Sequence, residues 1–131
     1  MTTWITVCDT CKTGDWQIGS EKTDGARLAE LVENTATPLA PQVQVRRFSC
    51  LMGCSRACNV TIQAEGKLAY TLSEFAPIPE AADAIVAYAR LHADSTTGQV
   101  PYRSWPAGVK GHFAARHLPL PDAPDLPGAA E

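Results

Sequence analysis

Apolar and polar positions recur with strand or helix spacing over most of the first 94 residues, and each pattern predicts one element. A β-branched, apolar run at residues 4–7 predicts a short strand. A capping residue, Thr23 or Asp24, precedes apolar positions at helical spacing, which predicts a helix from about Gly25 that ends before Pro38. The apolar face of this helix is expected to contain Ala26, Leu28, Leu31, Val32 and Thr35.

Three further strands and a second helix are predicted downstream. The segment VQVRRF at residues 43–48 reads as a strand, and residues 60–62 and 68–72 alternate on either side of a Glu-Gly turn, as in a β-hairpin. A helix is expected to begin at Pro79, because proline is favoured in the first turn of a helix. Its buried face is expected to contain Ala82, Ile85, Val86, Ala89 and His92. The order β-α-β-β-β-α over residues 4–94 predicts an α/β fold, with Gly98 closing the region.

The composition changes after residue 95, which divides the chain into a domain at 1–95 and a C-terminal extension at 96–131. The extension contains six of the ten prolines, a density that predicts no regular helix or strand, and its last dozen residues are expected to be mobile. The segment 95–121 has no acidic residue. It is expected either to fold back along the acidic body or to dock on an acidic partner. Its basic residues include Arg103, Lys110 and Arg116.

Length, charge and hydropathy exclude several functional classes. A chain of 131 residues is typical of one domain, and a net charge of −3 disfavours nucleic-acid binding. No apolar run approaches the roughly 18 residues of a membrane span, and the N-terminus lacks the basic and apolar regions of a signal peptide. We therefore expect a cytoplasmic protein with reduced thiols. The chain has no phosphate loop, nucleophile elbow or metal-hydrolase helix, so it is not expected to be an enzyme.

Five cysteines in two groups carry the candidate chemistry. Cys8 and Cys11 follow the first strand in VCDTC, and Cys50, Cys54 and Cys58 follow the second in CLMGCSRAC. If these strands are neighbours, both loops leave the same end of the sheet and the thiols meet there. Four thiolates bind either a [2Fe-2S] cluster or a zinc ion, and the C-x3-C-x3-C spacing is unusual for zinc. A C-x-x-C pair also occurs in thiol oxidoreductases, but here a long loop separates the pair from the helix.

Other side chains are candidates to tune, bind or shield such a centre. The cations beside the second group would raise the potential of an anionic cluster; the alternative is a solvated strand edge and loop. These are Arg46, Arg47 and Arg56. The histidines are candidate ligands in principle only, and His92 is expected on the helix face instead; the other two are His112 and His117. Three aromatic side chains would either cover the centre or pack on the core, namely Trp16, Trp105 and Phe113.

The predicted order of elements, with CDTC after the first strand and CLMGC after the second, resembles the thioredoxin-like [2Fe-2S] ferredoxins. It is also similar to the ferredoxin-like subunit of respiratory NADH dehydrogenase. This resemblance implies a [2Fe-2S] cluster on Cys8, Cys11, Cys50 and Cys54, and one-electron transfer to a redox partner protein. The first pair is more closely spaced than in those families and Cys58 is additional, so either Cys11 or Cys58 completes the ligand set. Many such ferredoxins are dimers, which makes a homodimer one assembly to test.

The whole chain more closely resembles an uncharacterised bacterial family of predicted metal-binding proteins. The resemblance lies in VCDTC, in CLMGCSRACNVTIQ and in GQVPYRSWP. Such proteins are often encoded beside cobalamin-synthesis genes, so the resemblance implies a link to cobalt or corrinoid metabolism. Two alternatives stay open: a zinc or cobalt carrier that uses the same thiolates, and a C-x-x-C thiol oxidoreductase.

Overall fold

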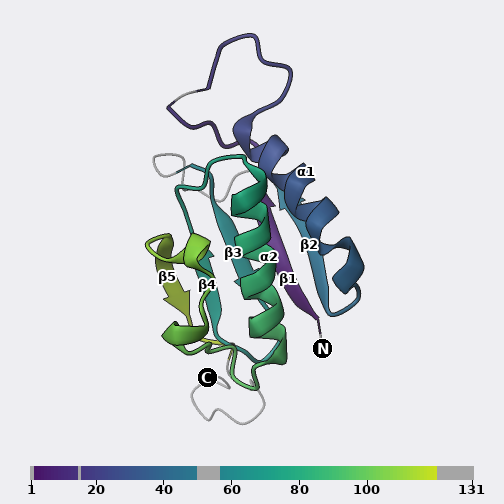
Figure 1. The fold of residues 1–131 in the computed structure, drawn as a ribbon, viewed down its shortest axis with the longest axis vertical. Coiled ribbons are helices and arrows are strands. Elements are labelled where there is room, and N and C mark those ends of the chain that lie inside the picture. Colours follow the sequence, from purple (N-terminus) through teal and green to yellow (C-terminus); the bar gives the residue numbers. More distant parts are fainter. Residues whose placement is uncertain (1, 15, 50–56, 121–131) are drawn as a thin grey trace, which may run out of the picture.

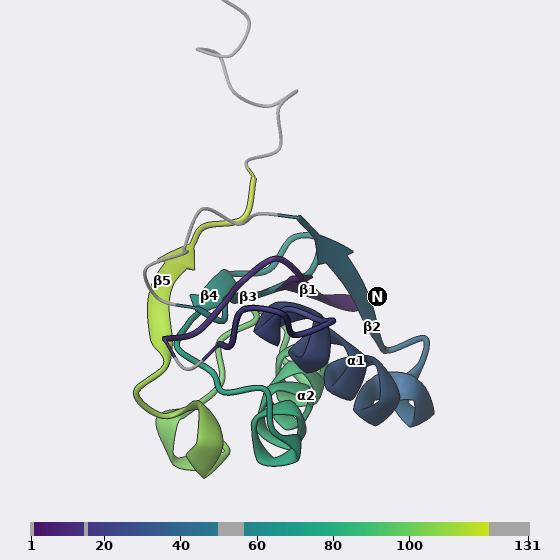
Figure 2. The ribbon, with the colours of Figure 1, turned by 90° about the horizontal axis from the view of Figure 1, so that it is seen from above.

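A computed structural model describes residues 2–14, 16–49 and 57–120. Five strands form one mixed sheet in the order β2-β1-β3-β4-β5, and two α-helices cover one of its faces (Figure 1 and Figure 2). The strands are β1 (Thr3–Cys8), β2 (Val43–Phe48), β3 (Val60–Gln63), β4 (Ala69–Leu72) and β5 (Phe113–His117). The helices are α1 (Asp24–Ala36) and α2 (Pro79–Asp94), with short 3₁₀ helices η1 (Thr37–Leu39), η3 (Tyr102–Ser104) and η4 (Ala107–Val109). In the described ranges, no helix combines the length and hydropathy that crossing a membrane requires.

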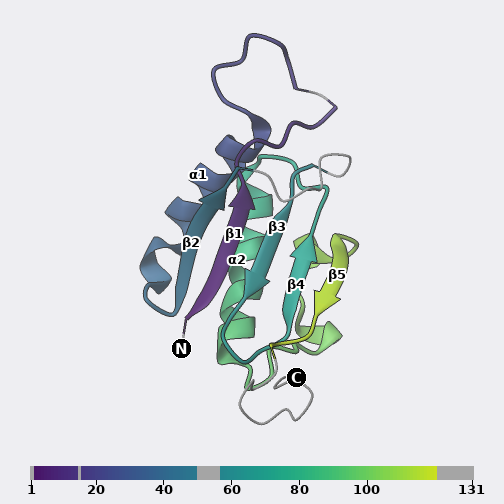
Figure 3. The same ribbon diagram turned by 180° about the vertical axis from the view of Figure 1, so that it is seen from behind.

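The strand topology confirms the predicted α/β fold and is that of a thioredoxin-like domain. β1 and β2 are parallel, whereas β1 pairs antiparallel with β3, β3 with β4, and β4 with β5. Cys8 lies opposite Phe48 in the β1–β2 register, so the two strands end at the same edge of the sheet (Figure 3). The loops that lead to the two cysteine groups therefore start side by side, as the sequence predicts for neighbouring strands.

The core lies between the sheet and the two helices. Its centre is formed by fully buried side chains of β1 and β3 that face the helices, including Ile5, Val7, Val60 and Ile62. The predicted face of α2 is buried in full. The predicted face of α1 is correct only in part: Leu28 and Val32 are buried, but the other three residues are half-exposed. Ala29 and Ala36 are buried instead.

The prediction that the extension has no regular element is wrong. Residues 113–117 form β5, which pairs with β4 and extends the sheet. The prolines do not interrupt it, because Pro101 and Pro106 precede the 3₁₀ helices η3 and η4 and Pro119 follows the strand. The basic segment thus folds back on the body, as one of the two alternatives predicts. Residues 121–131, whose mobility the sequence also predicts, lie outside the described ranges.

A buried polar cluster joins α2 to the sheet at the end opposite the cysteines. His92 is fully buried, and its Nε2 donates to the Leu68 carbonyl at 2.6 Å. Since a carbonyl only accepts, the tautomer is fixed, and Nδ1 accepts from Thr3 Oγ1 at 3.0 Å. Lys67 Nζ donates to the carbonyls of His92 and Ala93, at 3.1 and 2.8 Å, and so satisfies the last turn of α2. Both ring nitrogens of His92 are therefore used structurally.

His92→Gln should lower the free energy of unfolding at neutral pH by about 2 to 3 kcal/mol, because it leaves buried partners unpaired. Burial lowers the pKa of His92 below that of the unfolded chain. The folded protein therefore binds fewer protons at His92 than the unfolded chain does. The stabilisation that His92 contributes is lost as the pH falls below the ordinary histidine pKa of about 6.5. Urea unfolding at about pH 7.5 and about pH 5.5 measures both effects. The loss of stability in His92→Gln relative to wild type should be smaller at the lower pH. His117→Gln, which changes an exposed histidine, is the control and should have the same stability as wild type at both pH values.

Candidate metal centre

Three of the five cysteines lie in the described ranges, and all three thiols are buried at the edge where β1 and β2 end. The exposed fractions of Cys8, Cys11 and Cys58 are 1%, 2% and 0%. Cys8 and Cys11 are close enough to hydrogen-bond, and the charges of both would act on Cys58. The structure therefore groups Cys58 with the C-x-x-C pair. Cys50 and Cys54, which complete the predicted ligand set, lie outside the described residues.

The end of β2 is bonded to the C-x-x-C loop. Thr10 Oγ1 donates to the carbonyl of Ser49, and the Cys8 thiol donates a long bond of 3.9 Å to the same oxygen. In addition, the Asp9 N–H donates to the carbonyl of Phe48 at 3.1 Å. The residue immediately before Cys50 is thus fixed beside the first cysteine pair.

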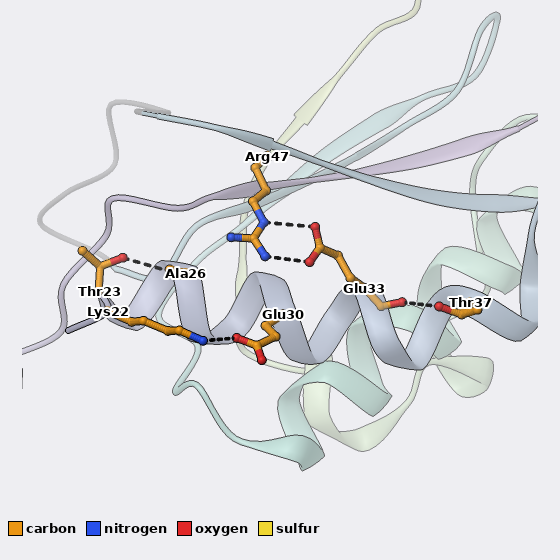
Figure 4. A network of polar contacts seen from close by, with 7 residues as sticks. All are labelled: Lys22, Thr23, Ala26, Glu30, Glu33, Thr37 and Arg47. Atoms are coloured by element: carbon orange, nitrogen blue, oxygen red, sulfur yellow. Dashed lines mark hydrogen bonds and ion pairs between the residues drawn. The ribbon is translucent and has the colours of Figure 1, made fainter. Parts of the chain in front are cut away.

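The C-x-x-C loop also packs on the N-terminus of α1, although a long stretch of sequence separates the two. Thr23 caps the helix by accepting from the Ala26 N–H at 3.1 Å (Figure 4), and its hydroxyl donates to the carbonyl of Asp9. The Gly25 N–H donates to the carbonyl of Cys11 at 2.9 Å. A Cβ at Gly25 would lie 2.0 Å from the carbonyl oxygen of Cys8, so only glycine permits this contact. The C-x-x-C loop and the N-terminus of α1, although far apart in sequence, are therefore in direct contact.

The chain between Cys11 and α1 forms a loop that projects beyond the end of the sheet (Figure 1). Its base is held by the Asp24 carboxylate, which accepts from the N–H and the hydroxyl of Thr13 at 2.7 and 2.8 Å. Within the loop, the indole of Trp16 donates to the carbonyl of Lys22 at 3.1 Å. Trp16, a predicted shield for the centre, thus stabilises the loop, while Ile18 is 97% exposed.

The buried environment resists ionisation of the thiols. Burial raises the pKa of Cys11 to about 11, and hydrogen bonding with Cys8 adds to the increase, whereas hydrogen bonds from Asn59 oppose it. Burial likewise raises the pKa of Cys58 to about 12, together with the charges of Cys11, Asp24 and Cys8. At neutral pH these thiols are protonated unless a cation offsets the charge.

Two of the three predicted tuning arginines, Arg46 and Arg47, are engaged with other partners. Arg47 forms a bidentate pair with Glu33 of α1, at 3.0 and 2.6 Å (Figure 4). Arg46 lies on the face of the sheet that carries neither α1 nor α2, where it donates to Thr6 Oγ1 at 2.8 Å and to Gln63 Oε1 at 3.1 Å. Arg56 lies outside the described residues. The charge of Arg47 is therefore already partly offset.

The remaining candidate histidines and aromatic residues fix the extension to the body. His112 stacks on Phe75 with ring centroids 4.3 Å apart, and its Nδ1 donates to a main-chain carbonyl after β4. His117 is hydrogen-bonded to a threonine of β4. Trp105 and Phe113 pack against each other with ring centroids 4.4 Å apart, beside Tyr88 of α2. Their packing on the core agrees with the second of the two expectations for them.

Two residues of the site carry no signal that singles them out in the sequence. Gly25 is identified only by the backbone that approaches it, and Asn59 only by its bond to a sulfur 48 residues away. Within the described ranges, no three His, Cys, Asp or Glu side chains are arranged to hold a metal ion by themselves. Cys50 and Cys54, the other two residues of the predicted ligand set, lie outside those ranges.

Comparison with known proteins identifies one family. The family described as "Protein of unknown function (DUF1636)" matches residues 5–119, which include all five cysteines, both α-helices and every strand except the first two residues of β1. No curated protein and no solved structure matches the chain significantly. Because the match covers most of its length, the chain belongs to this family of proteins of unknown function.

Proposed function

We propose that this protein binds a [2Fe-2S] cluster through Cys8, Cys11, Cys50 and Cys54 and transfers single electrons to a partner protein. One observation supports this proposal above all. The C-x-x-C pair lies at the ends of two parallel strands, and its loop is bonded to Ser49, immediately before the second cysteine group. The chain therefore enters the second cysteine group directly beside the first pair, which supports a shared ligand set.

The chemistry of the donor set fits such a cluster. Soft thiolates select iron–sulfur clusters, zinc and copper(I) over hard cations. Because burial raises the pKa of Cys11, a metal that binds its sulfur must displace the proton, and the positive charge of the metal then stabilises the buried thiolate. A [2Fe-2S] cluster would supply one-electron chemistry, while this chain supplies ligand sulfurs, hydrogen bonds to them and a buried environment.

The same observations disfavour a thiol oxidoreductase. Reactive cysteines of that class have lowered pKa values and are partly exposed. Here Cys8 and Cys11 are only 1% and 2% exposed, although the N-terminus of α1 beside them favours a thiolate. Their sulfurs are therefore poorly accessible to a disulfide substrate.

A zinc or cobalt carrier with the same thiolates is the competing candidate. The unusual C-x3-C-x3-C spacing of the second group favours the iron–sulfur cluster over zinc. A role in cobalamin or cobalt metabolism is supported by the sequence resemblance alone and stays a prediction.

The decisive experiment is an absorption spectrum of protein purified without oxygen, with iron, acid-labile sulfide and zinc assayed in the same sample. We expect a red-brown protein with two irons and two sulfides per chain. A colourless protein with one zinc would overturn the electron-transfer proposal in favour of a carrier. Failure to bind any metal, even after reconstitution with iron and sulfide, would overturn both.

A further inference from the structure

We propose that Asn59 is a positioning residue of the centre: its side-chain amide holds the Cys11 sulfur in place as a ligand and raises the reduction potential of the bound cluster. This inference rests on the proposed function. It concerns a residue outside the cysteine set, and its test distinguishes a failure of this inference from a failure of the proposed function.

The amide of Asn59 reaches the sulfur from a well-fixed strand end. Asn59 Nδ2 donates to Cys11 Sγ at 3.4 Å, and the residue is 3% exposed. Its main-chain carbonyl accepts from the Cys8 N–H at 3.1 Å. Asn59 therefore contacts both cysteines of the pair, one through its side chain and one through its backbone.

The neighbouring residues restrain this strand end further. Cys58, directly before Asn59, exchanges two main-chain hydrogen bonds with Phe75, at 3.2 and 3.4 Å. Val60, directly after it, is fully buried and paired with both β1 and β4. The amide donor is thus held in place before any metal arrives, which reduces the entropy cost of its bond to the sulfur.

An N–H···S bond strengthens as the sulfur becomes more negative. It therefore favours the ligating thiolate over the thiol, and the reduced cluster over the oxidised one. Removing the donor should weaken metal binding and lower the midpoint potential. A carboxylate in its place should have the larger effect, because it adds repulsion to the loss of the bond.

The test compares Asn59→Leu and Asn59→Asp with Gln63→Leu, which removes an amide from β3, the strand that directly follows Asn59. The Gln63 amide bonds to Arg46 instead of to a sulfur. Cobalt(II) alone is titrated into the metal-free proteins, and the thiolate-to-cobalt absorption gives the affinity. We expect a loss of about 10- to 100-fold in Asn59→Leu, a greater loss in Asn59→Asp and none in the control.

The midpoint potential of the reconstituted cluster is the second readout, since purely structural damage would not shift it in one direction. It should fall in both Asn59 variants and not in Gln63→Leu. Asn59→Ser replaces any variant whose circular dichroism shows that it is unfolded. If folded Asn59 variants match the wild type in affinity and potential, the role of Asn59 is overturned and the cluster proposal stands. If the wild type binds neither cobalt nor cluster, both are overturned.

Discussion

Cys11→Ser should lower the iron and sulfide content of anaerobically purified protein by at least about tenfold, because it removes one of the four thiolate ligands of the proposed cluster. Cys58→Ser should retain the visible chromophore. Cys58 is fully buried and fixed by its main-chain bonds to Phe75. We therefore expect Cys11 to act as a ligand of the proposed cluster and Cys58 to serve in packing.

Parallel metal assays and spectra of Cys8→Ser, Cys11→Ser and Cys58→Ser check this assignment. Cys8→Ser should behave like Cys11→Ser, since the two thiols are hydrogen-bonded to each other and belong to the same proposed ligand set. Circular dichroism shows whether each variant is folded, which separates ligand loss from unfolding. A Cys58→Ser protein that is folded but without iron, beside a red-brown Cys11→Ser, would reverse the roles of the two residues.

Gly25→Ala should destabilise the protein, although helix propensity alone favours alanine over glycine by about 1 kcal/mol. The new Cβ would lie 2.0 Å from the carbonyl oxygen of Cys8 and 3.0 Å from the N–H nitrogen of Cys11. Both are backbone atoms, so either α1 or the C-x-x-C loop must move. We expect the free energy of unfolding to fall by about 1 to 3 kcal/mol, as in overpacked cores, and bound iron to fall with it.

Urea unfolding and an iron assay measure these two effects. Gly14→Ala is the control, because Gly14 lies in the loop that leads to α1 and its Cβ would meet no atom within 4 Å. An increase in stability for Gly25→Ala would show that propensity outweighs the contact, and that the helix and the cysteine loop are not closely packed.

Hydrophobic spacing predicts α2 well and α1 less well, for a physical reason. The predicted face of α2 consists of side chains that all pack into the core. α1 buries Ala29 and Ala36, whose small side chains contribute little to an apolar pattern, and it contacts α2 as well as the sheet. β5 carries no pattern at all, because only Phe113 is half-buried and the rest of the strand is exposed. The position of β5 is set by its backbone pairing with the edge of β4 and not by its own side chains.

The candidate site, like the fold, is predictable from the sequence only in part. The cysteine grouping and two neighbouring parallel strands suffice to predict that the two cysteine loops start at the same edge of the sheet. The identity of the contacts around the thiols is not predictable, because it depends on atoms that meet across long stretches of chain. Asn59 reaches Cys11 from 48 residues away, and Gly25 meets the carbonyl of Cys8 from another element.

The projecting loop between Cys11 and α1 is closed at its base by bonds from Thr23 to Asp9 and from Gly25 to Cys11. The cost of closing a loop rises only with the logarithm of its length. A foreign peptide grafted near Ile18 would therefore leave the thiols where they are and be displayed next to them. The scaffold that holds the sulfurs and the projecting loop are therefore two separate modules, and each can be re-engineered without the other.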